Sequence, residues 1–98
     1  MKRSILVVDD DPVMREMVSD LLDSRGFEAV LASCGTEALD TVAEREVDCV
    51  LTDLQMPGMD GLELLGALRE RQPETPVVMM TSFGTIETAV EAMRVGGP

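Results

Sequence analysis

The sequence predicts an α/β domain in which a parallel sheet is covered by helices on both faces. Short apolar runs, typical of buried strands, alternate with longer segments whose apolar residues recur at helical spacing. Each expected strand leads directly into an expected helix, and this alternation favours parallel strands joined by right-handed crossovers. We therefore expect four strands and four helices that form a single domain over residues 1–98.

The first unit combines a buried strand with a well-marked helix. Residues 5–8 form an unbroken aliphatic run, the kind found in a strand that is buried on both faces. A helix is expected over residues 12–25. Asp11 can cap this helix, Pro12 suits its first position, and Gly26 ends it.

The second and third units follow the same pattern. A short strand is expected at residues 27–31, and a further strand at residues 47–52 ends at Asp53. Between these strands, a turn at Gly35 and Thr36 precedes an amphipathic helix. The apolar residues of that helix are Ala38, Leu39, Val42 and Ala43.

A loop and a capped helix are expected after Asp53. Pro57 disfavours helix at the residue before it, and Gly58 permits unusual backbone dihedrals. Asp60 and Glu63 have the spacing of a capping box, which marks the start of the third helix. The buried face of this helix is expected to hold Leu64, Leu65 and Leu68.

The last unit begins with a strand at residues 77–80 that ends at Thr81 and Ser82. A fourth helix is expected after Gly84, because apolar residues recur there at one helical face. These residues are Ile86, Ala89, Val90 and Met93.

Composition excludes several classes of function. With 8 Lys and Arg against 19 Asp and Glu, the net charge of −11 opposes direct binding to nucleic acids and to anionic membranes. The chain has no His, Trp or Tyr, so it lacks zinc-type His ligands, Ser-His or Cys-His catalytic pairs and broad aromatic platforms. Two cysteines and no recognisable targeting segment predict a cytoplasmic location.

Acidic and hydroxyl side chains follow three of the expected strands. Asp9 and Asp10 follow the first strand, Asp53 ends the third, and the fourth leads into Thr81. Because the carboxyl ends of parallel strands lie at one edge of a sheet, these groups are expected to converge. Clustered carboxylates repel one another unless a cation compensates them, and Mg²⁺ prefers such oxygen ligands. One carboxylate can also attack phosphorus to form an aspartyl phosphate, whereas Asp11 is expected only to cap a helix.

Three segments together resemble the receiver domain of two-component response regulators. They are residues 5–12, 50–61 and 77–82. Residues 84–94 also look like receivers attached to enhancer-binding transcription activators. The resemblance implies a signalling module of a phosphorelay, and not an enzyme, that accepts a phosphoryl group from a sensor histidine kinase.

The resemblance also implies a flavodoxin-like strand order, 2-1-3-4-5, and roles for individual residues. Asp53 would be the phosphoacceptor. Asp9 and Asp10 would hold Mg²⁺ together with Asp53, and the backbone carbonyl of Gln55 would be a further ligand. Thr81 would be the switch hydroxyl that couples phosphorylation to an output surface.

The chain departs from the family pattern at its end. Family members continue into a fifth strand with a lysine and an aromatic switch residue, followed by a fifth helix, and residues 1–98 hold no counterpart. We therefore expect a truncated receiver with the strand order 2-1-3-4. Its fourth strand would be left as an edge, which predicts a homodimer or the exchange of a strand or helix between chains.

Two alternatives remain open. Residues 9–13 fit the D-x-D-x-V pattern of haloacid-dehalogenase-like phosphatases, in which Asp9 would be the nucleophile and Asp11 the general acid. That interpretation leaves the segment after Asp53 unexplained. The chain could also be a pseudo-receiver that never turns over phosphate and serves as a dimerisation module.

Overall fold

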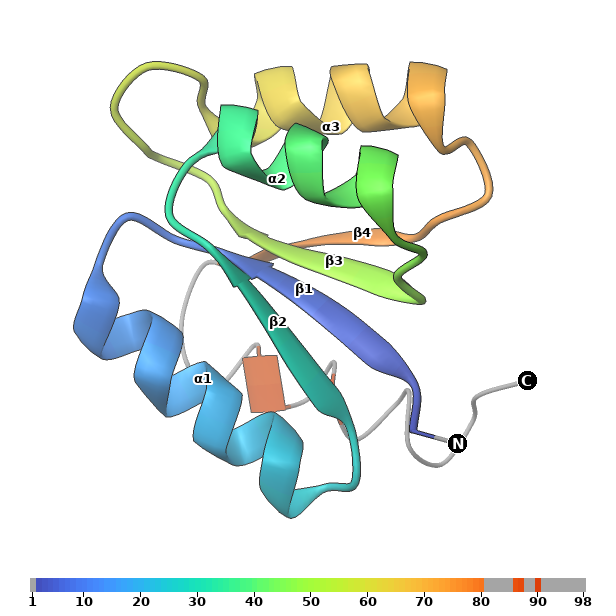
Figure 1. The fold of residues 1–98 in the computed structure, drawn as a ribbon. Coiled ribbons are helices and arrows are strands. Elements are labelled where there is room, and N and C mark those ends of the chain that lie inside the picture. Colours follow the sequence, from blue (N-terminus) through green and yellow to red (C-terminus); the bar gives the residue numbers. More distant parts are fainter. Residues whose placement is uncertain (1, 81–85, 88–89, 91–98) are drawn as a thin grey trace.

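The computed structural model describes residues 2–80, 86–87 and 90 (Figure 1). Its centre is a four-stranded parallel sheet with the order β2-β1-β3-β4, which confirms the predicted order 2-1-3-4. The strands are β1 (Ser4–Val8), β2 (Glu28–Ala32), β3 (Cys49–Asp53) and β4 (Val77–Met80). β1 and β3 are thus the central pair, and β2 and β4 form the edges of the described sheet.

Helices cover both faces of this sheet, as predicted. Figure 1 shows α1 on one face and α2 with α3 on the other. These helices are α1 (Pro12–Ser24), α2 (Gly35–Glu44) and α3 (Gly61–Arg71). Most residues of the expected fourth helix lie outside those described, but Ile86 and Val90 are buried in the same apolar cluster as α1. Within the described ranges, no helix has the length and apolar character needed to cross a membrane.

Two apolar clusters flank the sheet. Successive residues of β1 alternate between them, as expected for a strand buried on both faces. The cluster on the α1 face holds Ile5, Val7, Val18, Leu22, Phe27, Cys49, Leu51, Met80, Ile86 and Val90. The cluster on the α2 and α3 face holds Leu6, Val8, Ala32, Ala38, Leu39, Val42, Val50, Met56, Leu64 and Leu68.

Side-chain caps set the helix starts where the sequence predicted them. Oδ1 of Asp11 accepts a hydrogen bond from the N–H of Val13 at 2.9 Å. Oδ1 of Asp60 accepts from the N–H of Glu63 at 2.9 Å, and Oε1 of Glu63 accepts from the N–H of Asp60 at 3.3 Å. The predicted capping box is therefore formed. Gly26 follows α1 with φ +86°, the left-handed backbone conformation that often ends a helix.

β2 and β3 start later than predicted. The N–H of Phe27 donates to the carbonyl of Leu22 at 3.0 Å, so this residue closes the end of α1 and β2 starts one residue later. Before β3, Oδ2 of Asp48 accepts from the N–H of Ser4 at 2.7 Å. Because a side chain takes that donor, the paired residues of β1 and β3 begin only at Cys49.

α2 and α3 differ from the prediction in detail. Gly35 and Thr36 form the first turn of α2 and not a separate turn before it. Ala43 is exposed and Leu65 is half-buried, so both lie beside the predicted buried faces and not on them. The buried apolar residues of these faces are Ala38, Leu39, Val42, Leu64 and Leu68.

The register of the sheet brings the ends of its two central strands together. Val8 of β1 pairs with Thr52 of β3. Asp9, which directly follows β1, and Asp53, which ends β3, therefore leave neighbouring strands at the same edge of the sheet.

Candidate acidic site at the carboxyl edge of the sheet

Asp9 is the buried member of the acidic cluster at this edge, with 5% of its surface exposed. Its N–H donates to the carbonyl of Ala32 on β2 at 3.2 Å, and its carbonyl accepts from Nη1 of Arg15 on α1 at 2.7 Å. Its side-chain Oδ1 accepts from the N–H of Asp11 at 2.9 Å. Contacts to both neighbouring elements therefore fix the position of this carboxylate.

The surroundings of Asp9 disfavour its charged form. Burial raises the pKa of this carboxyl group above its ordinary value, and the nearby carboxylates of Asp53, Asp10 and Asp11 raise the pKa further. The hydrogen bond from the N–H of Asp11 lowers the pKa but is outweighed. A bound cation would relieve this repulsion, because it places positive charge among the carboxylates.

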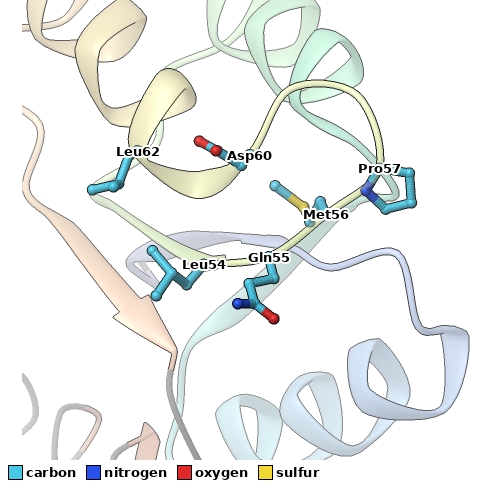
Figure 2. Close-up of a pocket in the computed structure, with 6 residues that line it drawn as sticks. All are labelled: Leu54, Gln55, Met56, Pro57, Asp60 and Leu62. Atoms are coloured by element: carbon cyan, nitrogen blue, oxygen red, sulfur yellow. The ribbon is translucent and has the colours of Figure 1, made fainter.

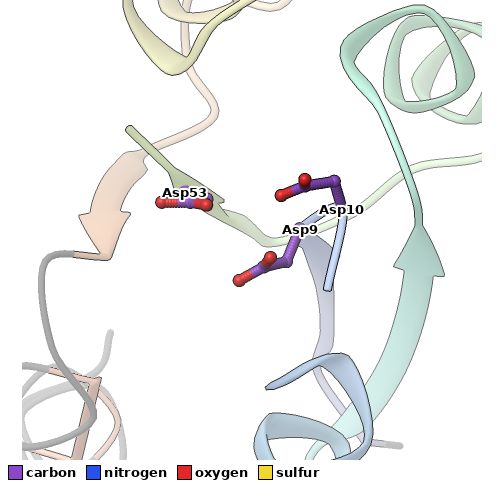
Figure 3. A group of neighbouring side chains, drawn as sticks. All are labelled: Asp9, Asp10 and Asp53. Atoms are coloured by element: carbon purple, nitrogen blue, oxygen red, sulfur yellow. The ribbon is translucent and has the colours of Figure 1, made fainter. Parts of the chain in front are cut away.

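Asp53 and Asp10 complete the cluster (Figure 3). Asp53 is half-buried, and its Oδ1 accepts from the N–H of Gln55 at 3.4 Å, whereas Asp10 is exposed. One carboxylate oxygen from each of Asp9, Asp10 and Asp53 lies within 4.8 Å of the others. Figure 3 shows the three side chains grouped at the ends of β1 and β3. The convergence of these carboxylates confirms the sequence-based expectation.

A cavity of about 190 Å³ opens at these carboxylates. Met14 of α1, Met80 of β4 and Ile86 form the apolar part of its lining, and Asp11 also lines it. The acidic groups thus face a space that solvent or a small ligand can enter. Three carboxylates at this spacing can hold a metal ion, since hard divalent cations take oxygen ligands and offset like charges.

A larger hollow of about 580 Å³ lies along the connection between β3 and α3 (Figure 2). It is lined by Leu54, Gln55, Met56, Pro57, Asp60 and Leu62. The carboxylate in this lining, Asp60, already caps α3, and the other lining side chains offer no nucleophile or acid. Gln55 lines this hollow and also contacts the acidic cluster through its backbone, because its N–H donates to Oδ1 of Asp53. We therefore assign chemistry to the smaller, acidic cavity.

The remaining predicted site residues have different outcomes. Thr81, the predicted switch hydroxyl, lies outside the described residues. Asp11 acts as the helix cap that the sequence predicted. Arg15, which donates to the carbonyl of Asp9, was not singled out from the sequence. The available signal was a basic residue one helical turn after the cap, where its side chain can reach back to the strand end.

Comparison with known proteins gives an independent family assignment. Residues 5–97 match the model of the response regulator receiver domain. Response regulator protein FleR of Pseudomonas aeruginosa is 44% identical over 96 residues, which cover 98% of this chain and 20% of that protein. Regulatory protein AtoC of Escherichia coli is 44% identical over 92 residues, which cover 94% of this chain and 20% of that protein. The chain spans about a fifth of the length of each of these two relatives.

Solved structures show the same fold. Response regulator protein TrrA of Thermotoga maritima, in complex with Mg²⁺-BeF, superposes with a TM-score of 0.79 at 32% identity. The match covers 94% of this chain and 80% of that one. TrrA in complex with histidine kinase ThkA matches with a TM-score of 0.77 at 36% identity, over 83% of this chain and 70% of that one.

Proposed function

This chain belongs to the response regulator receiver domain family, and we propose that Asp53 is the residue on which it accepts a phosphoryl group. Receiver domains of two-component systems are signalling modules and not catalytic enzymes. The observation that carries the proposal is the acidic cluster, in which Asp9 and Asp10 place carboxylate oxygens within 4.8 Å of one on Asp53.

Among the three carboxylates, Asp53 is best placed to act as the nucleophile. Asp9 is 5% exposed, and one of its oxygens is held by the N–H of Asp11, so access from solvent is restricted. Asp53 is half-buried at the end of β3, and the N–H of Gln55 on Oδ1 orients its carboxylate while leaving Oδ2 for attack. An oriented nucleophile is what an in-line transfer requires.

We propose that Mg²⁺ is bound by Asp9, Asp10 and Asp53, with the backbone carbonyl of Gln55 as a further ligand. The donor set fits a hard cation, which takes carboxylate and carbonyl oxygens and retains several waters. When bound, the ion would offset the negative charge of the carboxylates and of the incoming phosphoryl group. The Mg²⁺-BeF complex of the related TrrA supports this choice of metal.

The phosphodonor is proposed to be a phosphohistidine of a sensor histidine kinase. An oxygen of Asp53 forms a bond to phosphorus while the bond between phosphorus and the histidine nitrogen breaks, and the electron pair stays on that nitrogen. The products are an aspartyl phosphate and a free histidine. The complex of the related TrrA with histidine kinase ThkA supports this class of partner.

Output and location are further parts of the proposal. Thr81 is proposed as the switch hydroxyl. Control of transcription is proposed as the output, because the relatives include the transcriptional regulatory proteins FixJ and ZraR. Cys34 and Cys49 are both free, as expected in the reducing cytoplasm where we propose the protein acts.

Phosphorylation by acetyl phosphate with Mg²⁺, followed by borohydride trapping and peptide mapping, tests the proposal. We expect the label on Asp53, and we expect Asp53→Asn to abolish it. The matched control is Asp40→Asn, since Asp40 is an exposed carboxylate on α2 outside the cluster. This control should be labelled like the unmodified chain.

The two alternative functions predict different labelling. Label on Asp9 would support the phosphatase interpretation, in which that residue is the nucleophile. The absence of label from the unmodified chain, with acetyl phosphate and with a phosphorylated kinase, would support the pseudo-receiver. Either result contradicts the role proposed for Asp53.

A further inference from the structure

The connection between β3 and α3, residues 54–60, orients the Asp53 carboxylate. Its contact with that side chain is the hydrogen bond from the N–H of Gln55 to Oδ1 of Asp53, at 3.4 Å. Because the donor is a backbone group, its direction depends on the path of the whole connection. Any contact that holds this path in place also holds the carboxylate.

Backbone contacts fix the two ends of the connection to each other. The N–H of Gly61 donates to the carbonyl of Leu54 at 2.9 Å. A Cβ on Gly61 would collide with the carbonyl oxygen of Asp53 and would lie 2.9 Å from the Cα of Leu54. Both neighbours are backbone atoms that cannot rotate away, so the start of α3 rests directly against the end of β3.

The end of the connection that leads into α3 is held by α2. Met59 packs against the apolar cluster that lies between the sheet and the helices α2 and α3. A Cβ on Gly35, the first residue of α2, would lie 2.7 Å from Sδ and 3.0 Å from both Cβ and Cγ of Met59. Gly35 has no positive φ, so the reason for glycine at this position is the space that Met59 occupies.

We propose that Met59, seated against Gly35, positions the connection that orients Asp53, so that the first turn of α2 is coupled to phosphorylation. The inference rests on the proposed function of Asp53. A side chain on Gly35 would displace the Met59 side chain, and its contact with the Met59 Cβ at 3.0 Å would shift that residue, and with it the connection, by a few tenths of an ångström. The N–H of Gln55 would then no longer hold the carboxylate in its present direction.

Gly35→Ala tests this coupling, with Gly66→Ala as the matched control. Gly66 also lies within a helix, but a Cβ added there meets nothing within 4 Å. The measurement is the rate of Asp53 phosphorylation by acetyl phosphate at saturating Mg²⁺, beside the melting temperature. We expect Gly35→Ala to slow labelling by about tenfold or more, since a misplacement of ~1 Å can cost a rate about 10²-fold. Gly66→Ala should stay within about twofold of the unmodified chain.

Rescue by Met59→Ala separates positioning from a general loss of stability. This substitution removes Sδ and Cγ and leaves the Cβ as the one side-chain atom near Gly35. In the Met59→Ala background, Gly35→Ala should slow labelling by less than it does in the unmodified background, because the contacts with Sδ and Cγ are gone and only the contact with Cβ remains. An equal loss in both backgrounds would show independent effects and would overturn the proposal.

A measurement without any change at Gly35 covers the case in which Gly35→Ala does not fold. Titration of the unmodified chain with Mg²⁺ should shift the amide NMR signal of Gly35, and Met59→Ala should reduce that shift by at least about half. A shift of unchanged size in Met59→Ala overturns the coupling. If the unmodified chain neither binds Mg²⁺ nor is labelled at Asp53, the proposed function fails and this inference with it. If labelling is normal and Gly35→Ala has no effect, only this inference fails.

Discussion

The side chain of Asp9 is buried, and its negative charge is unfavourable there. Burial and the carboxylates of Asp53, Asp10 and Asp11 raise the pKa of its carboxyl group above the ordinary value of 3.8. A carboxyl group whose pKa is raised on folding binds its proton more tightly in the folded chain than in the unfolded chain. Its favourable contribution is therefore complete below pH 3.8 and is lost as the pH rises through the folded-state pKa.

Asp9→Asn is accordingly expected to stabilise the metal-free protein at neutral pH. Asparagine keeps the acceptor for the N–H of Asp11 and removes the buried negative charge. A gain of about 1 kcal/mol corresponds to a rise of roughly 4–8 °C in melting temperature for a domain of this size. Thermal unfolding in EDTA measures it, with exposed Asp40→Asn as the control. The difference in melting temperature between Asp9→Asn and the unmodified chain should disappear below pH 3.8. A lower melting temperature of Asp9→Asn at neutral pH would contradict the prediction.

The two cysteines are expected to differ sharply in reactivity. Burial raises the pKa of the Cys49 thiol to about 11, whereas the contact with the Thr36 hydroxyl, at 3.3 Å, is the main cause that lowers the pKa of Cys34. Since the thiolate is the nucleophile, iodoacetamide near neutral pH should alkylate Cys34 and spare Cys49 until the protein is unfolded. Peptide mass spectrometry measures both rates. Thr36→Val should slow the alkylation of Cys34, and an unchanged rate would show that the hydroxyl does not stabilise its thiolate.

At the scale of elements, the residues at the start of α3 link the stability of this helix to the geometry of the acidic site. Asp60 and Glu63 satisfy each other's N–H groups, and Gly61 places the first turn of α3 against the end of β3. The hydrogen bond from the N–H of Gly61 to the carbonyl of Leu54 also joins the two ends of the connection that contains Gln55. A loss of the cap should therefore weaken α3 and loosen the segment next to Asp53.

Asp60→Ala is expected to destabilise the protein by about 0.5–2 kcal/mol, the usual cost of losing a side-chain cap. Urea unfolding measures the change. Asp40→Ala provides the control, because Asp40 lies exposed within α2, where alanine is the better helix former. Glu63→Ala, which removes the reciprocal bond, should also destabilise but by less. Equal stabilities of Asp60→Ala and Asp40→Ala would mean that the capping box contributes little.

At the scale of the whole molecule, the sheet edge and the net charge act in opposite directions. β4 is an edge of the described sheet, and its residues Val77, Val78 and Met79 are half-buried. An apolar edge strand favours pairing with another chain. The net charge of −11 opposes it, because two copies repel each other at low ionic strength.

Self-association of a polypeptide of residues 1–98 is therefore expected to increase with salt. Screening lengths fall from about 30 Å at 0.01 M to about 3 Å at 1 M ionic strength, which removes the repulsion and leaves the apolar contact. Light scattering over a dilution series at both salt concentrations measures the change in mass. Val78→Lys, on the edge strand, should reduce association at high salt. A monomer at every salt and protein concentration would show that β4 is not an association surface.

The sequence by itself determined the elements and the chemistry that they carry. The apolar runs, the caps Asp11 and Asp60 and the stop at Gly26 are local signals, because they act within one turn or one strand. Parallel strands then imply that Asp9 and Asp53 meet at one edge of the sheet. The strand order came from the family resemblance, and the structure confirmed it.

Only the tertiary structure decided which groups lie against which. Asp9 is buried and Asp10 is exposed because β1 packs between its neighbouring strands. The spacing of these two residues in the sequence does not predict this difference in burial. The contact of Gly35 with Met59 joins segments that are distant in the chain. Such contacts depend on how whole elements pack, and periodicity or capping within one element carries no information about them.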